Sequence, residues 1–190
     1  MSEYQYYEFA AVDQPLSDKQ MKELRAISTR AEITPTSFVN EYHWGDFKGD
    51  PRKLIASYFD AFMYYANWGT RWCMFRLPKE AALLPALKRF ETPEAIDIGI
   101  KGKNVIVDIC IDDEPGDYEE PYGMTLGRLI PARRALLEGD LGPLYVAWLA
   151  AVQRHMVDDD EAEPCDAAEL EPIGAGSQGW PGFCTLPMTC

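Results

Sequence analysis

Residues 95–111, AIDIGIKGKNVIVDICI, contain two runs of alternating apolar residues separated by a short segment with Gly102. This pattern is typical of a β-hairpin. The register that brings the large aliphatic side chains onto one face pairs Ile100 with Val105, Ile98 with Val107 and Ile96 with Ile109. It also places Asp97 opposite Asp108 on the other face. The hairpin therefore predicts an antiparallel sheet with an apolar face toward the core.

The chain before the hairpin predicts two further strands and a helix. Residues 4–12 are aromatic and β-branched enough for a strand. Ser17 as N-cap and Gln20 three residues later form a capping box, which predicts a helix over 18–30. Residues 31–44 favour an edge or interrupted strand because β-branched and aromatic residues follow an early proline.

Asp50 and Pro51 are typical of a helix start, as N-cap and first helical residue. The apolar residues that follow recur at helical spacing, which predicts a central core helix ending at Asn67-Trp68-Gly69. Residues 70–77 then favour a strand closed by Pro78, and 79–90 a helix kinked at Pro85. Both HWGD at 43–46 and NWGT at 67–70 are interpreted as turns at element ends.

An acidic loop over 112–123 and two helices, around 124–138 and 141–156, are expected after the hairpin. The stripe expected to pack inward on the last helix consists of Leu141, Leu144, Tyr145, Trp148, Leu149 and Val152. From residue 157 the helical pattern is lost among Gly, Pro and acids. The prediction is an α+β fold: one domain over 1–156, with a mostly antiparallel sheet covered by helices, and a disordered acidic tail over 157–190.

Charge restricts the classes of partner. The 190-residue chain carries a formal charge of −13, and the part after Arg154 has no Lys or Arg. A negative body argues against nucleic acid and against anionic membranes. The five cysteines have no metal-type spacing and are interpreted as reduced thiols, and the N-terminus lacks a leader pattern. The expected location is the cytoplasm.

Two stretches, YQYYEFAAVDQPLSDKQMKELRAISTRAEITPTSFVNEYHWGDFKGDP at 4–51 and YFDAFMYYANWGTRW at 58–72, resemble a family of uncharacterised bacterial proteins. The GDLGPLYVAWLAAVQ segment at 139–153 is also similar to that family. The resemblance implies a genuine folded domain. It implies no reaction, because the family has no known activity.

The stretch around His43 is the candidate catalytic site. Glu41 and His43 are two residues apart on an expected strand and point to the same side, with Asp46 on the adjoining turn. A histidine held by a carboxylate is a usual general base, and the helix starting at Asp50 could bind an anion beside it. The alternative, which the pattern favours, is that the glycines shape a turn, the aromatics cover the core edge and Asp50 only caps a helix.

The pair Asp97 and Asp108, with Asp112 farther along, is the candidate metal site for Ca²⁺ or Mg²⁺. Facing carboxylates repel unless a cation or a basic neighbour relieves them, and Arg71 or Arg76 could do so. The spacing does not match a calcium-binding loop. An acidic solvated face without any cofactor is the favoured interpretation.

Function is expected from surfaces rather than from a motif. No nucleophile elbow, phosphate loop or zinc-helix pattern occurs in the chain. The leading hypothesis is a non-catalytic accessory protein that binds another protein, for which a basic partner would fit, and the alternative is a small hydrolase or transferase using His43 with Glu41 or Asp46. A structural subunit with a Trp-rich oligomer interface is a third possibility. The candidate ligand-binding residues are Trp44, Asp50, Trp68 and Arg71.

Overall fold

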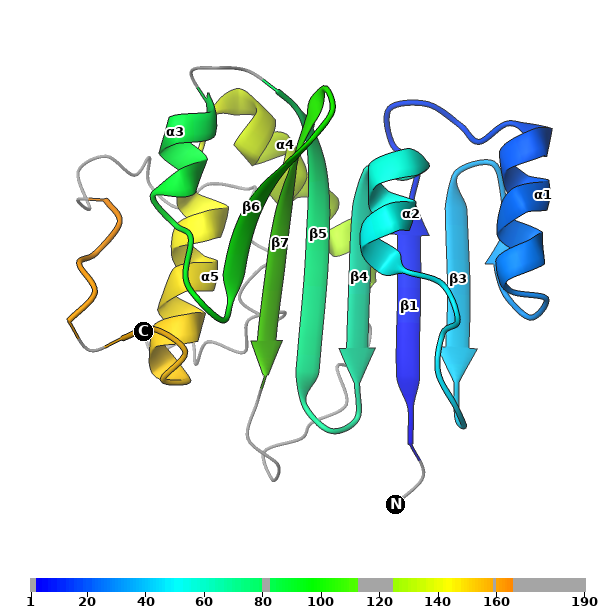
Figure 1. The fold of residues 1–190 in the computed structure, drawn as a ribbon, viewed down its shortest axis with the longest axis horizontal. Coiled ribbons are helices and arrows are strands. Elements are labelled where there is room, and N and C mark those ends of the chain that lie inside the picture. Colours follow the sequence, from blue (N-terminus) through cyan, green and yellow to red (C-terminus); the bar gives the residue numbers. More distant parts are fainter. Residues whose placement is uncertain (1–2, 80–82, 113–124, 159, 166–190) are drawn as a thin grey trace.

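A computed structural model of the chain describes residues 3–79, 83–112, 125–158 and 160–165. These residues form a seven-stranded sheet with helices on both faces (Figure 1). The strand order is β2-β3-β1-β4-β5-β7-β6, and every pairing is antiparallel. The predicted α+β class and the mostly antiparallel sheet covered by helices are therefore confirmed.

The strands are β1 (Gln5–Ala10), β2 (Glu32–Ile33), β3 (Ser37–Tyr42), β4 (Ala61–Ala66), β5 (Thr70–Pro78), β6 (Ile96–Lys101) and β7 (Asn104–Asp112). The helices are α1 (Asp18–Ile27), α2 (Pro51–Ser57), α3 (Leu83–Lys88), α4 (Ile130–Glu138) and α5 (Gly142–Gln153), with a 3₁₀ turn, η1 (Leu126–Arg128), before α4. In the described part of the chain no single helix is long and apolar enough to cross a membrane; η1–α4 and α5 pass that test only as a pair, bent by 117°.

The helices divide the core into two, one on each face of the sheet (Figure 1). The α1–α2 core lies over β3, β1 and β4 and is rich in aromatic residues, namely Tyr7, Phe9, Phe38, Phe47, Phe59, Phe62 and Tyr64. The α3–α5 core covers the opposite face and is mostly aliphatic, with Ile96, Ile98, Val105, Val107, Ile109 and Ile111 from the hairpin. Strand β4 contributes to both, because alternate residues point to opposite faces.

The hairpin register is confirmed, with Ile100 opposite Val105 and Asp97 opposite Asp108. The capping box is also confirmed, since the Ser17 side chain accepts from the Gln20 backbone and the Gln20 side chain from the Ser17 backbone. Helix α1 ends at Ile27, three residues before the predicted end. The edge or interrupted strand predicted over 31–44 is instead a hairpin, because β2 lies at the edge of the sheet and pairs antiparallel with β3.

The predicted core helix over 51–66 is wrong beyond its first seven residues. Helix α2 ends at Ser57, and the residues from Ala61 form β4, the central strand of the sheet. Strand β4 is buried almost throughout because both of its faces lie under helices. A strand with two apolar faces has no alternation, and its aromatic residues match helical spacing as well as strand spacing.

The inward stripe predicted for the last helix is partly wrong. Leu144 and Trp148 are buried, but Val152 is 39% exposed, and the small residues Ala147 and Ala151 pack inward instead. Small side chains let α5 approach the sheet closely, so the buried face follows the alanines rather than the largest apolar residues.

The chain beyond α5 still contacts the fold where it is described. The Tyr145 hydroxyl donates to Glu163 at 2.5 Å, Arg89 Nε donates to the Pro164 carbonyl at 2.8 Å, and Cys165 is 5% exposed. The expectation of a disordered tail over 157–190 falls mainly on residues 166–190, and that of an acidic loop over 112–123 on residues 113–123, both outside the described residues.

Strand β6 forms one edge of the sheet, and neighbouring residues occupy its outward backbone groups. The Thr92 hydroxyl accepts from Ile96 N–H at 2.9 Å, and Thr92 N–H donates to the Ile96 carbonyl at 2.9 Å. The Glu91 carboxylate accepts from Ile98 N–H at 3.3 Å. The segment between α3 and β6 therefore covers the first half of this edge.

Candidate functional site

Two exposed tryptophans lie at one end of the sheet. Trp44 follows β3 and is 77% exposed, and Trp68 lies in the β4–β5 turn and is 43% exposed. Gln5 at the start of β1 pairs with Tyr42 on β3 and with Ala66 on β4, so the two turns flank β1. Since neighbouring strands are about 4.8 Å apart, the strand ends that carry the two turns, on β3 and β4, lie roughly 10 Å from each other. We call this region the tryptophan end.

The Trp44 turn is held by a buried glutamine. The Gln5 amide nitrogen donates to the Gly45 carbonyl at 3.0 Å and to Asp46 Oδ1 at 3.1 Å. Its amide oxygen accepts from the Tyr7 hydroxyl at 2.8 Å and from the Tyr64 hydroxyl at 3.1 Å. Burial, together with the Asp46 carboxylate, raises the pKa of Tyr7 to about 12, and burial also raises the pKa of Tyr64. Both hydroxyls therefore remain donors at neutral pH and fix this amide.

The Trp68 turn is held by a second set of bonds. The indole N–H donates to the Thr70 hydroxyl at 3.0 Å. Tyr4 N–H donates to the Asn67 side chain and Asn67 N–H to the Tyr4 carbonyl, both at 3.0 Å. Gly69 has a φ of 107°, a conformation that a residue with a side chain rarely adopts.

Gly45 in the Trp44 turn has a φ of 73° and meets the same steric requirement. The two predicted Trp-Gly turns are therefore confirmed as turns at the ends of β3 and β4.

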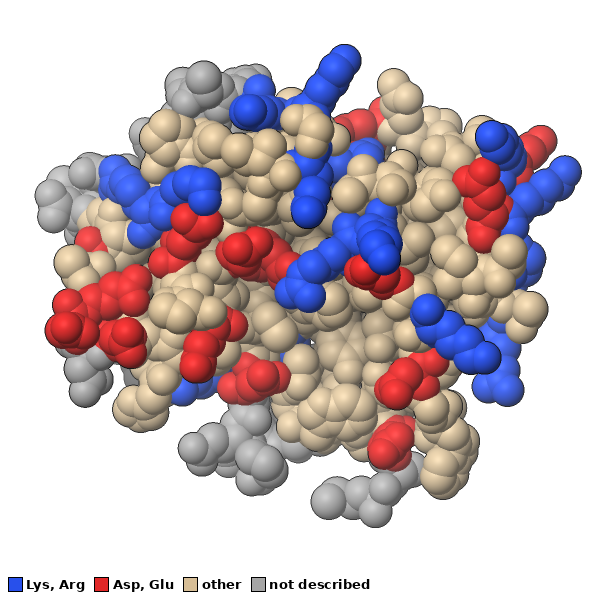
Figure 2. Space-filling view, in the orientation of Figure 1, with Lys and Arg blue, Asp and Glu red and all other residues tan. Residues whose placement is uncertain are grey.

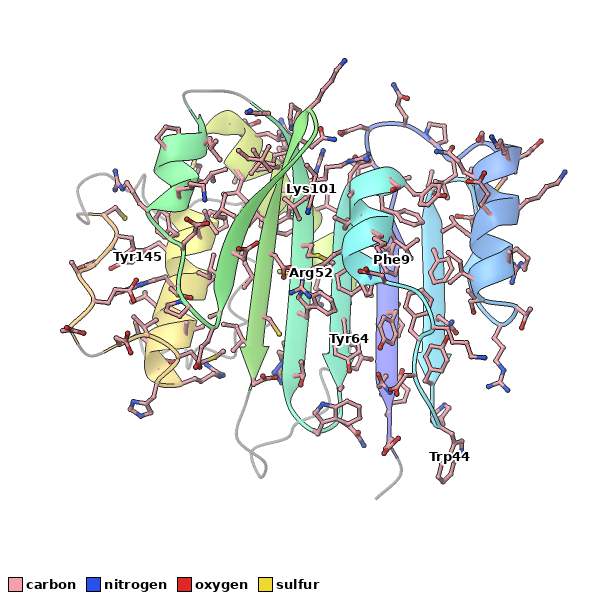
Figure 3. The ribbon with its side chains drawn as sticks, viewed as in Figure 1. Phe9, Trp44, Arg52, Tyr64, Lys101 and Tyr145 are labelled. Atoms are coloured by element: carbon pink, nitrogen blue, oxygen red, sulfur yellow. The ribbon has the colours of Figure 1, made fainter. Side chains whose placement is uncertain are left out.

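Carboxylates lie close to both tryptophans. Glu41 and Asp46 are within three residues of Trp44 and exposed, and Asp112, also exposed, pairs with Thr70 two residues from Trp68. Figure 3 shows Trp44 projecting away from the sheet at this end. The tryptophan end thus combines large exposed aromatic surface with negative charge.

The structure does not bring the three catalytic candidates together. His43 is exposed, and its ring lies 5.2 Å from that of Tyr4. Glu41 lies opposite Tyr6, whose ring packs on the α3–α5 side, whereas Asp46 is bound by Gln5 on the α1–α2 side. In the described ranges no hydrogen bond or ion pair joins His43 to either carboxylate.

The four ligand-binding candidates lie in three places. Trp44 and Trp68 share the tryptophan end. Asp50 caps α2 by accepting from Arg52 N–H at 3.0 Å and from Lys53 N–H at 3.3 Å, as the capping interpretation requires. Arg71 is 5% exposed on β5 and lies on the same face of the strand as Cys73 and Phe75, which belong to the α3–α5 core.

Asp108 is the candidate metal ligand with the most contacts. The Trp72 indole donates to Oδ1 at 2.5 Å, and Arg52 Nε donates to Oδ2 at 2.6 Å while its guanidinium lies 4.8 Å from the Trp72 ring. Burial raises the pKa of the Asp108 carboxyl, the two donors oppose this only in part, and Asp97 adds to it. The basic neighbour is therefore Arg52 from α2, and not Arg71 or Arg76.

Asp97 and Asp112 are both exposed, and Asp112 is four residues from Asp108 along β7, roughly 13 Å away. Within the residues that the structure describes, no group of three His, Cys, Asp or Glu is placed to hold a metal ion. Cys110 lies between Asp108 and Asp112 on β7. Burial, together with the Asp112 and Asp108 carboxylates, raises the pKa of its thiol to about 12, so the nucleophilic thiolate is not populated at neutral pH.

A buried ionic network lies at the opposite end of the sheet. Asp60, 1% exposed, accepts from Arg76 Nε at 3.1 Å and Nη2 at 2.6 Å, and from the backbone N–H groups of Val12 and Asp13. Burial raises the pKa of Asp60, but these donors outweigh it and the resulting pKa lies below the ordinary value. Arg133 on α4 donates to both oxygens of Asp13, at 3.0 and 2.6 Å.

The sequence patterns missed this network because Asp60 fell on the polar face of the predicted helix. A single acid between Phe59 and Ala61 in an apolar run, with Arg76 near the end of an apolar strand, was the available indication. Isolated charges in such runs are buried only when they are paired.

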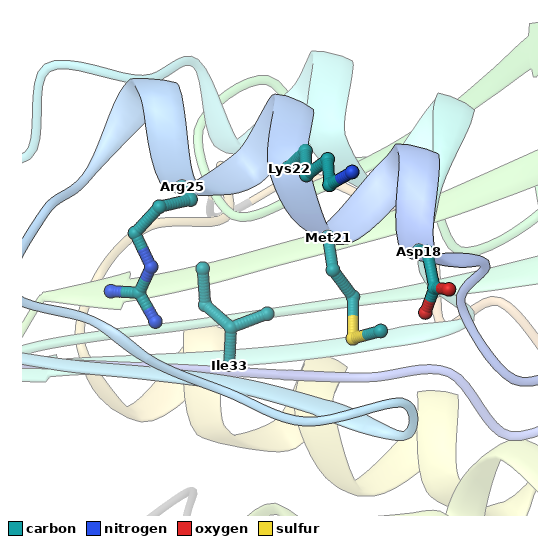
Figure 4. A pocket seen from close by; sticks show the side chains of 5 residues that line it. All are labelled: Asp18, Met21, Lys22, Arg25 and Ile33. Carbon is teal, nitrogen blue, oxygen red and sulfur yellow. The ribbon is translucent and has the colours of Figure 1, made fainter.

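Two hollows are formed by the described residues. One, of about 310 Å³, lies between α1 and β2 and is lined by Asp18, Met21, Lys22, Arg25 and Ile33 (Figure 4). The Arg25 guanidinium there is committed to backbone carbonyls, including that of Ala31 at 2.7 Å. The other, of about 530 Å³, adjoins the ionic network and is lined by Asp13, Gln14, Arg76, Pro78, Lys103 and Asn104.

No family model, curated protein or solved structure matches this chain.

Proposed function

We propose that the protein is a non-catalytic cytoplasmic accessory protein that binds another protein through the tryptophan end. The observation that carries this proposal is the exposure of Trp44 and Trp68 at the same end of the sheet. Tryptophan is enriched among the residues that dominate binding energy at protein interfaces. A tryptophan that is 77% exposed leaves a large apolar area in water, and burial against a partner removes it.

The rigidity of both turns supports the proposal. Gln5 holds the Trp44 turn, and the Thr70 hydroxyl orients the Trp68 indole. Side chains on fixed turns lose little conformational entropy when they bind, so more of the contact energy appears as affinity.

The charge around the tryptophans indicates the kind of partner. Glu41, Asp46 and Asp112 are exposed beside them, and the whole chain carries −13. A partner with a basic surface is complementary to this negative electrostatic potential, which also raises the rate of association. Nucleic acid and anionic membranes do not match it.

The test compares the full chain with a double variant, Trp44→Ala with Trp68→Ala, as bait in an extract of the native host. The control is Ile100→Ala, because Ile100 is 43% exposed, like Trp68, but lies at the opposite end of β6–β7. Bound proteins are identified by mass spectrometry, and the affinity of each purified partner is then measured. All baits are first checked for equal urea unfolding midpoints.

We expect a partner with a basic surface that binds the wild type and Ile100→Ala equally and the double variant at least roughly thirtyfold more weakly. Raising the salt concentration should weaken this binding. A partner held equally by the double variant would contradict the proposal, as would the absence of any partner. A mass that rises with concentration only when both tryptophans are present would instead make this end a contact between two copies of the chain.

A further inference from the structure

The cavity of about 530 Å³ lies at the other end of the sheet from the tryptophans. It is built from three segments far apart in the chain: Asp13 and Gln14 before α1, Arg76 and Pro78 at the end of β5, and Lys103 and Asn104 at the turn of the β6–β7 hairpin. Its volume is within the range of small-molecule sites. Nothing in the proposed protein interface uses it.

Arg76 supplies a fixed cationic donor in the cavity wall. Its Nε and Nη2 both bind Asp60, which holds the guanidinium plane in one orientation. Its side chain is 21% exposed, and Nη1 donates to no residue in the described part of the chain. Nη1 is therefore the nitrogen of this guanidinium that is available to a ligand in the cavity. Because Asp60 already fixes the guanidinium, binding a ligand costs this side chain little further conformational entropy.

The local charge is positive although the chain is acidic. Arg76 balances Asp60, and Arg133 balances Asp13. Lys103 lines the cavity and forms no ion pair with any residue described by the structure. Lys79 and Lys101 are exposed beside it, and Lys79 N–H donates to the Lys103 carbonyl at 2.8 Å. Figure 2 shows Lys and Arg side chains standing at this hairpin end of the molecule.

We propose that this cavity binds a small molecule carrying one oxyanion group, a phosphate or a carboxylate. Arg76 Nη1 and Lys103 Nζ are the charged donors, and the amides of Gln14 and Asn104 contact the uncharged part of the ligand. Asp13 at the rim is half exposed, and Arg133 pairs with its carboxylate, so Arg76 and Lys103 are the charged groups that the cavity offers to the oxyanion.

The test follows backbone amide NMR shifts of the full chain during titration with three probes, at ionic strength held constant with chloride. The probes are inorganic phosphate, glycerol 1-phosphate and acetate. The main variant is Lys103→Gln, an exposed position whose substitution leaves the fold intact, with Arg76→Lys as a second variant that keeps the charge but changes the donor geometry. Lys19→Gln on α1 removes the same charge from a side chain that is 87% exposed and serves as the control.

We expect saturable shifts at Gln14, Lys103 and Asn104 with at least one probe. Lys103→Gln and Arg76→Lys should each weaken this binding roughly tenfold, and Lys19→Gln should leave it unchanged. Tighter binding of glycerol 1-phosphate assigns the site to phosphorylated compounds, and tighter binding of acetate assigns it to carboxylates. The absence of saturation with all three probes overturns the proposal, as does equal weakening by Lys103→Gln and Lys19→Gln.

Discussion

The two faces of the sheet are packed in different ways. On the α1–α2 side, Phe9 lies within 4.5 to 6.3 Å, ring centre to ring centre, of four other phenylalanines. On the α3–α5 side, the hairpin presents isoleucine and valine to three helices, of which α5 contributes small alanine side chains. Two helices, α1 and α2, cover less of the sheet than three do, and large rings compensate because each buries 150–250 Å². The comparison teaches that the number of covering helices and the size of the buried side chains are matched on each face.

The largest expected effect comes from making the same large-to-small substitution once in each core. Phe9→Ala and Phe75→Ala each remove a fully buried ring, one from each face. Both should lower the free energy of unfolding by about 3–5 kcal/mol, with Phe9→Ala about 1 kcal/mol worse, because neighbouring rings close a cavity less well than aliphatic chains do. Urea unfolding measures both. An equal or larger loss for Phe75→Ala would show that the two cores are equally rigid.

The ionic network joins the two sides and should give the next largest effect. Asp60, directly before β4, binds Arg76, and Arg133 from α4 binds Asp13 before α1. Asp60→Asn should lower the free energy of unfolding by about 3 kcal/mol, because Arg76 loses a charged partner in a buried place. Glu23→Gln in the exposed Lys19–Glu23 pair is the control and should cost less than about 0.5 kcal/mol. Similar losses for both variants would show that the buried Asp60–Arg76 pair stabilises the fold no more than an exposed ion pair does.

Helix caps should give a smaller effect that is confined to the α1–α2 side. Ser17 and Asp50 accept backbone N–H groups at the starts of α1 and α2, whereas Thr125 before η1 makes no side-chain cap bond. Ser17→Ala and Asp50→Ala should each cost about 1 kcal/mol in urea unfolding, and Thr125→Ala close to nothing. A clear loss for Thr125→Ala would contradict this assignment of the caps.

The smallest effect is a difference in pH dependence between two buried aspartates. The lowered pKa of Asp60 means that its contribution is present above the ordinary carboxyl pKa of about 3.9 and is lost as the pH falls through its folded value. The raised pKa of Asp108 gives the opposite sign: its contribution is present below about 3.9 and is lost as the pH rises through its folded value.

Urea midpoints measured from pH 3 to pH 7 test this pair of signs. Asp60→Asn should reduce the rise in stability with pH relative to the wild type, and Asp108→Asn should steepen it. Slopes that change in the same direction for both variants would show that one of the two pKa directions is wrong.

Local pattern was enough to predict the fold where one face of an element meets water. The hairpin register followed from aliphatic residues on a single face, and the start of α1 from Ser17 and Gln20. The pattern failed at β4, because burial on both faces removes the alternation that distinguishes a strand from a helix. The two outcomes differ for a physical reason. An alternating pattern arises where one face of a strand is exposed to solvent, and strands at the centre of this sheet have no exposed face.

The candidate sites show the same limit. The sequence predicted that Asp97 faces Asp108, but it could not name Arg52 as the neutralising group, because α2 reaches β7 only through tertiary packing. Trp44 and Trp68 were recognised as turn residues, yet their common location depends on Gln5 lying between two strands that are far apart in the chain. Contacts of this kind arise from strand order, which single-residue patterns do not encode.

The covered edge of β6 bears on how the protein behaves at high concentration. An open edge strand is a template on which another chain can add its own strand, and repeated addition produces fibrils. Thr92 and Glu91 already occupy the outward groups of Ile96 and Ile98, and the strand at the other edge, β2, is only two residues long. The first half of one edge is therefore covered by the protein's own chain and the strand at the other edge is short, and both features limit strand addition to a sheet rich in aromatic and aliphatic residues.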